Sequence, residues 1–303
     1  MAERFIDRDY QRTYAEVADI KRKWLDVPYM DGARHTLDIY LPNEERETYP
    51  VIIDIFGGGL CFGDKSSHKL EPALRLLRNN GYAVVSMDYS LLADAPFPTQ
   101  IYEVKAVIRY VRAHATNYQL NPDAIALMGE SSGAQLAVTT AATHAVGAME
   151  RDDFGEDPDV SEDVQAVIAM YGPYDFDKFV EQFAEAGITS KYPETGTAES
   201  FQGQLFGKQA PKDVPELVKK ANPVTYFSAK MPPILAMVGR ADPVVPYQQT
   251  VNMMEAARKA IGKDKTPYYI VEDGVHGPDD YMGATLTQVK ADFLEKWLKE
   301  QHV

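Results

Sequence analysis

Nearly unbroken apolar runs alternate with amphipathic stretches along most of this chain. Runs of this kind are typical of strands that are covered on both faces of a sheet. They lie at residues 51–56, 83–87, 124–128, 164–170, 234–239 and 268–271. Helical patterns separate them, at about 68–79, 100–116, 132–148, 247–261 and 284–300. The alternation predicts βαβ units and therefore an α/β fold, with a mostly parallel central sheet and helices on both faces.

The start of the chain follows other patterns. Over residues 3–25, apolar side chains recur near helical spacing among many charges, which predicts an amphipathic helix. Asp31-Gly32 then favours a turn between two short extended runs. The second run, residues 35–41, alternates apolar and polar positions, and we interpret it as a half-exposed antiparallel edge strand.

A long segment interrupts the alternation between the strands at 164–170 and 234–239. It is too long for an ordinary connection, and it is rich in proline and in short aromatic pieces. We expect short helices here, lying over the carboxyl edge of the sheet. Residues 172–230 and about 1–25 would then form a small helical cap on a single domain of residues 1–303.

Composition narrows the range of partners. The net charge is −14 and the pI is near 4.9, which opposes binding to nucleic acid and to anionic lipid. Cys61 is the one cysteine, so no intrachain disulfide can form. No apolar stretch is long enough to span a membrane, and the first residues lack a signal-peptide pattern. We expect a cytoplasmic protein, while the sequence leaves open whether it forms a homo-oligomer.

The pentapeptide Gly129-Glu130-Ser131-Ser132-Gly133 fits the pattern G-x-S-x-G. A buried strand is predicted before it and an alanine-rich helix after it, which is the context of a sharp strand-to-helix turn that exposes a serine oxygen. Glycine is needed where a side chain would collide with the neighbouring elements. Ser131 is therefore the candidate nucleophile, because it holds the central position.

Several further motifs accompany this pentapeptide. In chain order they are FGGGLCFGDK (56–65), SMDYSLLADAPFP (86–98), GESSGAQLA (129–137), YGPYDF (171–176), GRADPVVP (239–246) and VHGP (275–278). With these motifs the sequence resembles the α/β-hydrolase superfamily, in its esterase branch related to hormone-sensitive lipase. Within that branch it is similar to the subgroup with feruloyl and acetyl-xylan esterases. The resemblance covers roughly residues 30–300 and implies the α/β-hydrolase fold.

The glycine run at residues 57–59 follows a buried strand, so its backbone N–H groups can approach a substrate oxygen closely. By resemblance, the oxyanion hole consists of the N–H groups of Gly58, Gly59 and Ser132. Phe56 stands where the family usually has histidine before the glycines. Because the donors are backbone groups, we expect the hole to persist, whereas the effect of Phe56 on the rigidity of the loop stays open.

The serine hydroxyl needs an imidazole base, which in turn needs a carboxylate to fix its tautomer. The order in this fold is serine, acid, histidine. His276 and His302 follow late enough, and His276 is favoured because it comes directly after a predicted strand. Asp242 in GRADPVVP is favoured as the acid by the family motif. Its rivals, close to His276, are Asp273, Asp279 and Asp280.

Aromatic side chains near these motifs are candidates for substrate binding: Phe56, Phe62, Tyr89 and Tyr174. The acid-rich stretch at 150–163 lacks the spacing of a calcium loop, and no zinc, phosphate-loop or dinucleotide pattern is present. We therefore expect neither a metal nor a cofactor.

The sequence favours a serine carboxylesterase that hydrolyses small neutral esters through an acyl-enzyme. Short-chain acyl, acetyl and hydroxycinnamoyl esters are candidate substrates, and the sequence does not choose among them. A peptidase or amidase with the same three residues, or a relative that only binds ligands, are the alternatives. Retention of His276 argues against the last.

Overall fold

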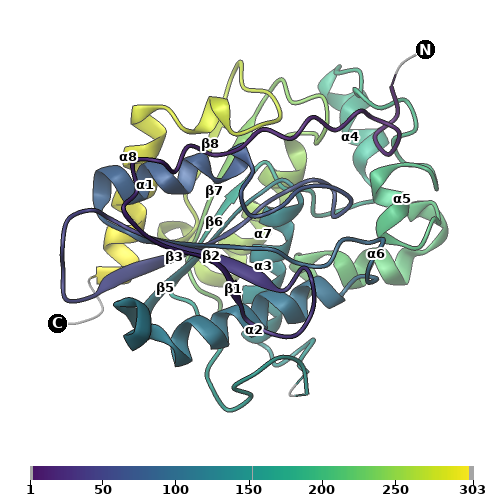
Figure 1. Ribbon diagram of the computed structural model, residues 1–303. Coiled ribbons are helices and arrows are strands. Elements are labelled where there is room, and N and C mark those ends of the chain that lie inside the picture. The colour runs from purple at the N-terminus through teal and green to yellow at the C-terminus, as the bar shows by residue number, and fades with distance from the viewer. Residues whose placement is uncertain (1–2, 152, 300–303) are drawn as a thin grey trace.

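The computed structural model of the protein describes residues 3–151 and 153–299 (Figure 1). His302, the last residue of the helix predicted over 284–300 and the first two residues of the predicted cap lie outside the described residues. Within the described ranges, no helix combines the length and the apolar character needed to cross a bilayer.

An eight-stranded sheet forms the centre of the molecule, with the order β1-β2-β4-β3-β5-β6-β7-β8. Strands β3 to β8 run parallel to one another, whereas β2 pairs antiparallel with both β1 and β4. The mostly parallel sheet predicted from the sequence is thereby confirmed. The strands are β1 Arg22–Pro28, β2 Thr36–Leu41, β3 Tyr49–Ile55, β4 Ala83–Met87, β5 Leu120–Glu130, β6 Ala166–Met170, β7 Ile234–Gly239 and β8 Tyr268–Val271.

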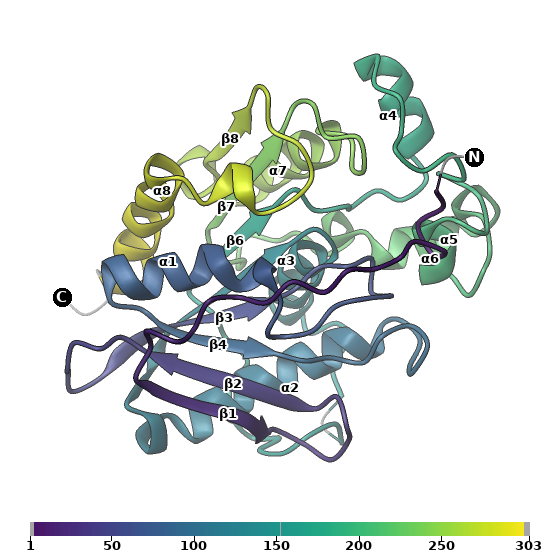
Figure 2. The same ribbon diagram turned by 45° about the horizontal axis from the view of Figure 1, so that its top comes forward.

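Helices cover both faces of this sheet (Figures 1 and 2). Adjacent strand residues point to opposite faces. Ile53 and Leu127 accordingly pack in the cluster that contains α2, α3 and α7, while Ile52 and Ala126 pack in the cluster with α1 and α8. These helices are α1 Glu71–Asn80, α2 Thr99–Ala113, α3 Ser132–His144, α7 Gln248–Ile261 and α8 Ala284–Leu294. Short 3-10 helices lie at His68–Leu70, Ala115–Tyr118, Pro211–Asp213, Pro223–Tyr226, Lys263–Lys265 and Asp279–Tyr281, and a π-helical turn at Glu295–Lys299.

The long segment after β6 contains short helices, as expected. They are α4 Phe179–Ala186, α5 Phe201–Leu205 and α6 Pro215–Ala221. Figure 2 shows them beyond the carboxyl ends of the central strands, at the end of the molecule that the N-terminal segment also reaches. That residues 172–230 act as a cap over a binding site remains a proposal.

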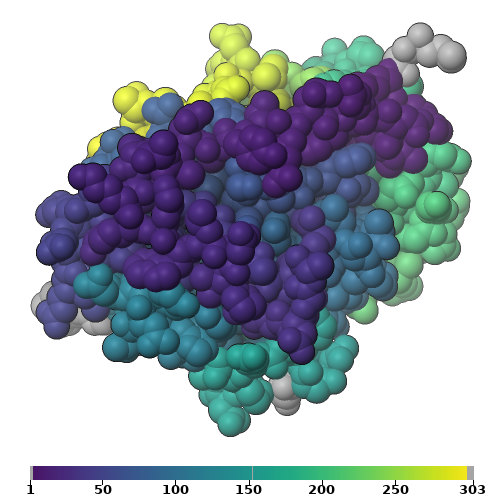
Figure 3. Space-filling view, in the orientation of Figure 1, coloured from purple at the N-terminus to yellow at the C-terminus, as the bar shows by residue number. Residues whose placement is uncertain are grey.

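The helix predicted over residues 3–25 is wrong. Residues 3–21 run mostly extended across α1 towards α5, and residues 22–28 form strand β1 (Figures 2 and 3). The backbone makes its hydrogen bonds with the loop before α1, where Ala15 N–H donates to Ser66 O and His68 N–H donates to Thr13 O. Its apolar side chains do not share one face, because Phe5 and Ile20 are buried in different hydrophobic clusters.

Strand β1 also changes the place of β2. We expected residues 35–41 to form a half-exposed edge strand, but β2 pairs on both sides and its residues are mostly buried. The edge is β1, in which Trp24 and Leu25 are exposed. The antiparallel direction of β2 is confirmed, whereas its edge position was wrong because the preceding residues add a further strand.

Candidate active site

Ser131 lies in the sharp turn between β5 and α3. Its backbone has φ 53° and ψ −124°, a conformation that residues other than glycine rarely adopt. The flanking glycines permit the close packing of this turn. A Cβ on Gly133 would lie 1.9 Å from the carbonyl oxygen of Ile55, and one on Gly129 would lie 2.3 Å from that of Gly133. The turn therefore presents the Ser131 hydroxyl above the carboxyl edge of the sheet.

Three loops bring Ser131, His276 and Asp242 into one hydrogen-bonded chain. His276 Nε2 is 2.9 Å from Ser131 Oγ, and His276 Nδ1 is 2.7 Å from Asp242 Oδ2. An ionised carboxylate only accepts, so Nδ1–H donates to Asp242 and Nε2 is left to accept the serine proton. These loops follow β5, β8 and β7, whose carboxyl ends meet at the same edge of the sheet.

Asp242 is fully buried, and its second oxygen is also occupied. Asp242 Oδ1 accepts the N–H groups of Val244 at 2.8 Å and Val245 at 2.9 Å. These bonds fix the carboxylate in the orientation that meets His276.

The rival acids lie close to His276 in sequence but have other partners or none. Asp279 pairs with His68 at 2.8 Å, Asp280 accepts the N–H of Val275 at 2.8 Å, and Asp273 is exposed. Of these carboxylates, Asp242 is the one that contacts the imidazole.

Two tyrosine rings pack in series against the His276 ring. The Tyr171 ring meets it edge-on at 4.9 Å between centroids, and the Tyr281 ring packs on Tyr171 at 4.6 Å. The Tyr281 hydroxyl donates to the carbonyl of Val275, the residue before the histidine. Tyr281 was not singled out in the sequence, because nothing in its spacing marks it as a support for this loop.

The glycine loop after β3 stands beside Ser131 with free donors. Gly58 and Gly59 have φ values of 143° and 62°, and both line the pocket that contains Ser131. Among the described residues, no acceptor is hydrogen-bonded to the backbone N–H groups of Gly58, Gly59 or Ser132. Donors of this kind can stabilise a developing oxyanion.

Side chains behind this loop keep it in place. Glu130 accepts the N–H of Gly57 and pairs with the Lys69 ammonium at 3.2 Å. On the other side, the Tyr89 hydroxyl donates to the carbonyl of Phe56 at 2.7 Å, and their rings stack at 4.2 Å. The loop is therefore fixed although Phe56 occupies the position usually taken by histidine.

A pocket of about 310 Å³ opens in front of Ser131. Side chains from several parts of the chain surround it, most of them aromatic or charged. They are Glu3, Phe5, Arg8, Asp9, Tyr10, Gln11, Lys69, Glu130, Lys191, Tyr192, Phe201 and Val244, together with the glycines of the loop, His276 and Gly277. The N-terminal segment thus forms one wall of the pocket.

Hydrogen bonds tie this wall to the segment between α4 and α5. The buried N–H of Phe5 donates to Glu194 Oε1 at 2.7 Å, and an Arg8 Nη donates to the Tyr192 hydroxyl at 3.2 Å. No sequence pattern indicates these contacts, because their partners are 189 and 184 residues apart along the chain.

The four aromatic residues predicted to bind substrate are not among the residues that line this pocket. Phe56 and Tyr89 are buried, because they stack on each other beneath the glycine loop. Phe62 packs against Tyr10 of the N-terminal segment, at 5.6 Å between centroids. Tyr174 is buried beside Gly172. Their roles here are to support the loops around the site.

Cys61 follows the glycine loop, but its thiol has little nucleophilic character. Burial raises the pKa of its thiol to about 11. At neutral pH the nucleophilic thiolate is therefore scarce.

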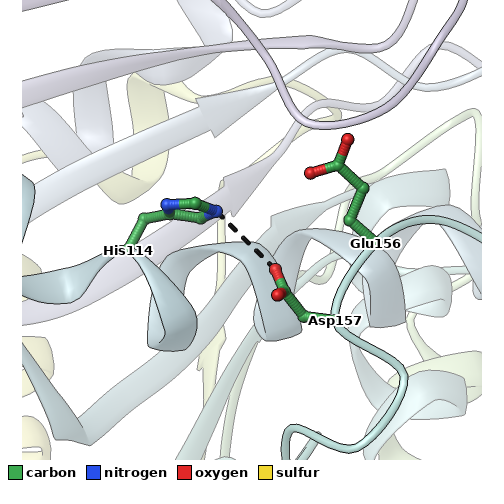
Figure 4. A group of neighbouring side chains, drawn as sticks. All are labelled: His114, Glu156 and Asp157. Atoms are coloured by element: carbon green, nitrogen blue, oxygen red, sulfur yellow. Dashed lines mark ion pairs between the residues drawn. The ribbon is translucent and has the colours of Figure 1, made fainter.

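Among residues 3–151 and 153–299, two groups of histidine and acidic side chains have ligand atoms close enough to consider a metal, and neither lines the Ser131 pocket. Figure 4 shows the first, in which the His114 ring is directed towards Asp157 at 3.6 Å, with Glu156 beside it. In the second, His144, Glu150 and Glu162 surround the ammonium of Lys105. The Lys105 ammonium already pairs with both carboxylates of the second group.

Known proteins share this architecture. The family model BD-FAE matches residues 37–257. A truncated carbohydrate esterase from gut microbiota is 29% identical, with a TM-score of 0.82 over 95% of this chain and 100% of that one. A thermophilic esterase from Thermogutta terrifontis is 20% identical, with a TM-score of 0.68 over 95% of this chain and 96% of its own, and shows the fold alone.

Relatives found by sequence are also named as esterases. The probable carboxylic ester hydrolase LipM of Mycobacterium tuberculosis is 27% identical over 91% of this chain, and esterase LipQ of the same organism is 28% identical over 89%. The chain spans 60% and 61% of the length of these two relatives. Because one family model accounts for more than half of the sequence, the chain belongs to the BD-FAE family, and its fold is that of the α/β-hydrolase esterases, as its motifs predicted.

Proposed function

We propose that the protein is a serine carboxylesterase that hydrolyses small neutral esters through an acyl-enzyme, with Ser131, His276 and Asp242 as its catalytic residues. The observation that carries this proposal is the chain of hydrogen bonds from Asp242 through His276 to Ser131 Oγ, at 2.7 and 2.9 Å. The names of the relatives, which include a carboxylic ester hydrolase and a carbohydrate esterase, support the same reaction class.

The proposed reaction begins when Ser131 Oγ attacks the ester carbonyl and His276 Nε2 takes its proton. Negative charge then develops on the carbonyl oxygen, and the N–H groups of Gly58, Gly59 and Ser132 stabilise it. A single donor of this kind can contribute about 3 kcal/mol. His276 next gives the proton to the departing alcohol, and a water molecule hydrolyses the acyl-enzyme by the same route.

The surroundings of Ser131 suit an ester with a polar alcohol part. Tyr10, Tyr192 and Phe5 offer aromatic surface, while Gln11 and Lys191 offer hydrogen bonds. Together with the carbohydrate esterase among the relatives, this lining supports acylated carbohydrates as substrates, with acetyl or hydroxycinnamoyl acyl groups. Cytoplasmic location and a homo-oligomeric state remain predictions.

A labelling experiment tests the reaction class. We expect a fluorophosphonate probe to label the wild-type protein and to leave Ser131→Ala unlabelled, because the probe needs an activated serine. The same pair should differ by at least about 10⁴-fold in hydrolysis of nitrophenyl acetate. Nitroanilide amides serve as the comparison substrate.

Each alternative has its own outcome. Faster cleavage of peptide amides than of esters would favour a peptidase or amidase. A folded wild-type protein that neither reacts with the probe nor hydrolyses esters would favour a protein that only binds ligands.

A further inference from the structure

We infer that Phe201 limits the size of the acyl group, and that a small apolar cavity behind the glycine loop receives it. This inference rests on the proposed esterase function and names the acyl class within it. It begins from a second cavity, of about 10 Å³, whose lining shares Gly59 and Phe201 with that of the main pocket. The lining residues are Gly59, Leu60, Ser132, Gln135, Pro173, Phe176, Phe201 and Leu205.

The direction of the acyl group follows from the proton transfer. The two substituents of an ester carbonyl leave the reacting carbon in different directions. The departing oxygen must reach His276 Nε2, which donates its proton, and His276 lines the main pocket but not the small cavity. The alcohol part therefore occupies the 310 Å³ pocket, and the acyl part points away from His276.

The small cavity lies where that acyl part would go. Two of its lining residues, Gly59 and Ser132, carry proposed oxyanion donors, so the cavity starts beside the carbonyl that these donors would hold. Most of its other lining groups are apolar, including Leu60, Phe176 and Leu205. An apolar acyl chain suits this lining better than a polar alcohol does.

The size of the cavity restricts the acyl group. A volume of about 10 Å³ is at the lower limit for a group the size of a water molecule, so the cavity receives at most about one methyl group. An acetyl group meets this limit, whereas butyryl or hydroxycinnamoyl groups exceed it. The structure thus favours acetyl esters among the acyl classes that the sequence left open.

Phe201 forms the partition between the two spaces. It lines both of them, and its ring is 6% exposed. The rings of Phe5 and Phe179 pack on it at centroid distances of 5.2 and 5.6 Å. At the start of its helix, the Ser200 side chain accepts the N–H of Gly203 and fixes the first turn. A ring held in this way cannot swing aside at low cost to admit a longer chain.

An acyl-length panel tests this inference. We would measure kcat/KM for nitrophenyl acetate, butyrate and hexanoate, and for methyl ferulate, with the wild type, Phe201→Ala, Phe201→Leu and Leu205→Ala. Leu205 lines only the small cavity, so its truncation enlarges the far end without touching the main pocket. Val218→Ala is the matched control, because Val218 is a buried residue of α6 that lines neither space.

We expect the wild type to prefer acetate over butyrate by about 10-fold or more, as the misfit of added methylenes implies. The butyrate-to-acetate ratio should rise about 10-fold in Phe201→Ala and by less in Phe201→Leu and Leu205→Ala. Val218→Ala should keep the wild-type ratio. Because a ratio is compared within one variant, a partial loss of folded protein does not change it.

A wild type that hydrolyses hexanoate or methyl ferulate as well as acetate would overturn the inference while leaving the esterase function intact. So would ratios in Phe201→Leu and Leu205→Ala that equal those of Val218→Ala. Failure of the wild type to cleave any ester would instead contradict the proposed function itself.

Discussion

The Ser131 backbone holds a conformation that costs a residue with a side chain about 1–3 kcal/mol. The buried strand and helix on either side enforce it. In return, Oγ is lifted to within 2.9 Å of His276 Nε2 and next to N–H groups that have no acceptor among the described residues. The strained residue and the free N–H of Ser132 belong to the same turn, while the glycine loop after β3 supplies the other two donors.

The variant Asp242→Asn distinguishes the role of Asp242 in orienting His276 from any role in folding. We expect a fall in kcat of about 10²–10⁴-fold, because an amide that donates to His276 Nδ1 stabilises the wrong tautomer. The asparagine carbonyl can still accept from Val244 or Val245, so the melting temperature should change little. Ester hydrolysis and thermal melting measure the two effects.

Asp273→Asn is the matched control, since this exposed acid lies three residues before His276 and does not contact it. Wild-type turnover in Asp242→Asn, or an equal loss in both variants, would contradict the assignment of Asp242.

At the scale of elements, the strand-turn-helix unit of β5 and α3 depends on how closely three backbones approach. Gly133 is the second residue of α3, and the carbonyl of Ile55 in β3 lies where its Cβ would be. The helix therefore rests directly on the strand that leads into the glycine loop. This contact fixes the distance between Ser131 and the oxyanion donors.

Gly133→Ala tests that contact. A Cβ placed 1.9 Å from a backbone oxygen forces the helix away from β3, and we expect a loss of about 1–3 kcal/mol or more in the free energy of unfolding. Urea denaturation provides the measurement. Gly283→Ala is the control, because no atom lies within 4 Å of the corresponding Cβ and its φ is −63°. Equal stability of the two variants would mean that α3 is not held against β3.

The N-terminal segment illustrates how tertiary contacts override a local pattern. Its spacing of apolar residues predicted a helix, yet the segment is extended between the loop before α1 and the region of α4 and α5. Phe5 gains contact with the rings of Tyr192 and Phe201 in this way, and Arg8 lies over the Phe5 ring at 4.3 Å. Burial at widely separated sites outweighs the modest propensity of one surface helix.

Across the whole molecule, the acidic loop at 148–163 is tied to the helices beneath it by a buried charge network. Lys105 of α2 pairs with Glu150 at 2.6 Å and with Glu162 at 3.5 Å, and Arg109 pairs with Glu162. His144 of α3 joins from the other side, 3.5 Å from Glu162 and 3.0 Å from Asp163. The acid-rich stretch thus has charged partners on α2 and α3.

This network makes stability depend on pH. The bond to Glu162, followed by that to Asp163, raises the pKa of His144 despite its partial burial. The pKa of His144 is higher in the folded protein than the value near 6.5 in the unfolded chain. Its contribution to the free energy of unfolding is therefore complete below about pH 6.5 and is lost as the pH rises through the raised pKa. We expect the wild type to lose its advantage over His144→Gln, at most about 1 kcal/mol for a partly exposed ring, as the pH rises from about 6.5 through the raised pKa of His144.

Urea denaturation of both proteins at several pH values measures this difference directly. The same pH dependence in His144→Gln as in the wild type would show that the histidine does not contribute. Stability should also fall at low pH, as the pH drops through the pKa of Glu162. Burial alone would raise that pKa, but the charged neighbours of Glu162 lower it.

The sequence by itself determined the α/β architecture and the six central strands, and it named the candidate residues for the chemistry. Each of these depends on local information. Continuous apolar runs report burial on both faces of a sheet, and the spacing around Ser131 reports a turn that only small residues permit. Chain order then restricted the choice of base and acid to a few residues, of which His276 and Asp242 form the observed hydrogen-bonded chain.

Only the tertiary structure decided which side chains surround Ser131. Phe56, Phe62, Tyr89 and Tyr174 were expected in the pocket but support the loops behind it, while Phe5, Tyr192 and Phe201 form its walls. A sequence pattern reports whether a side chain is apolar and which face of its own element it shares. It does not report which distant segment will cover that face, because such contacts depend on the path of the whole chain.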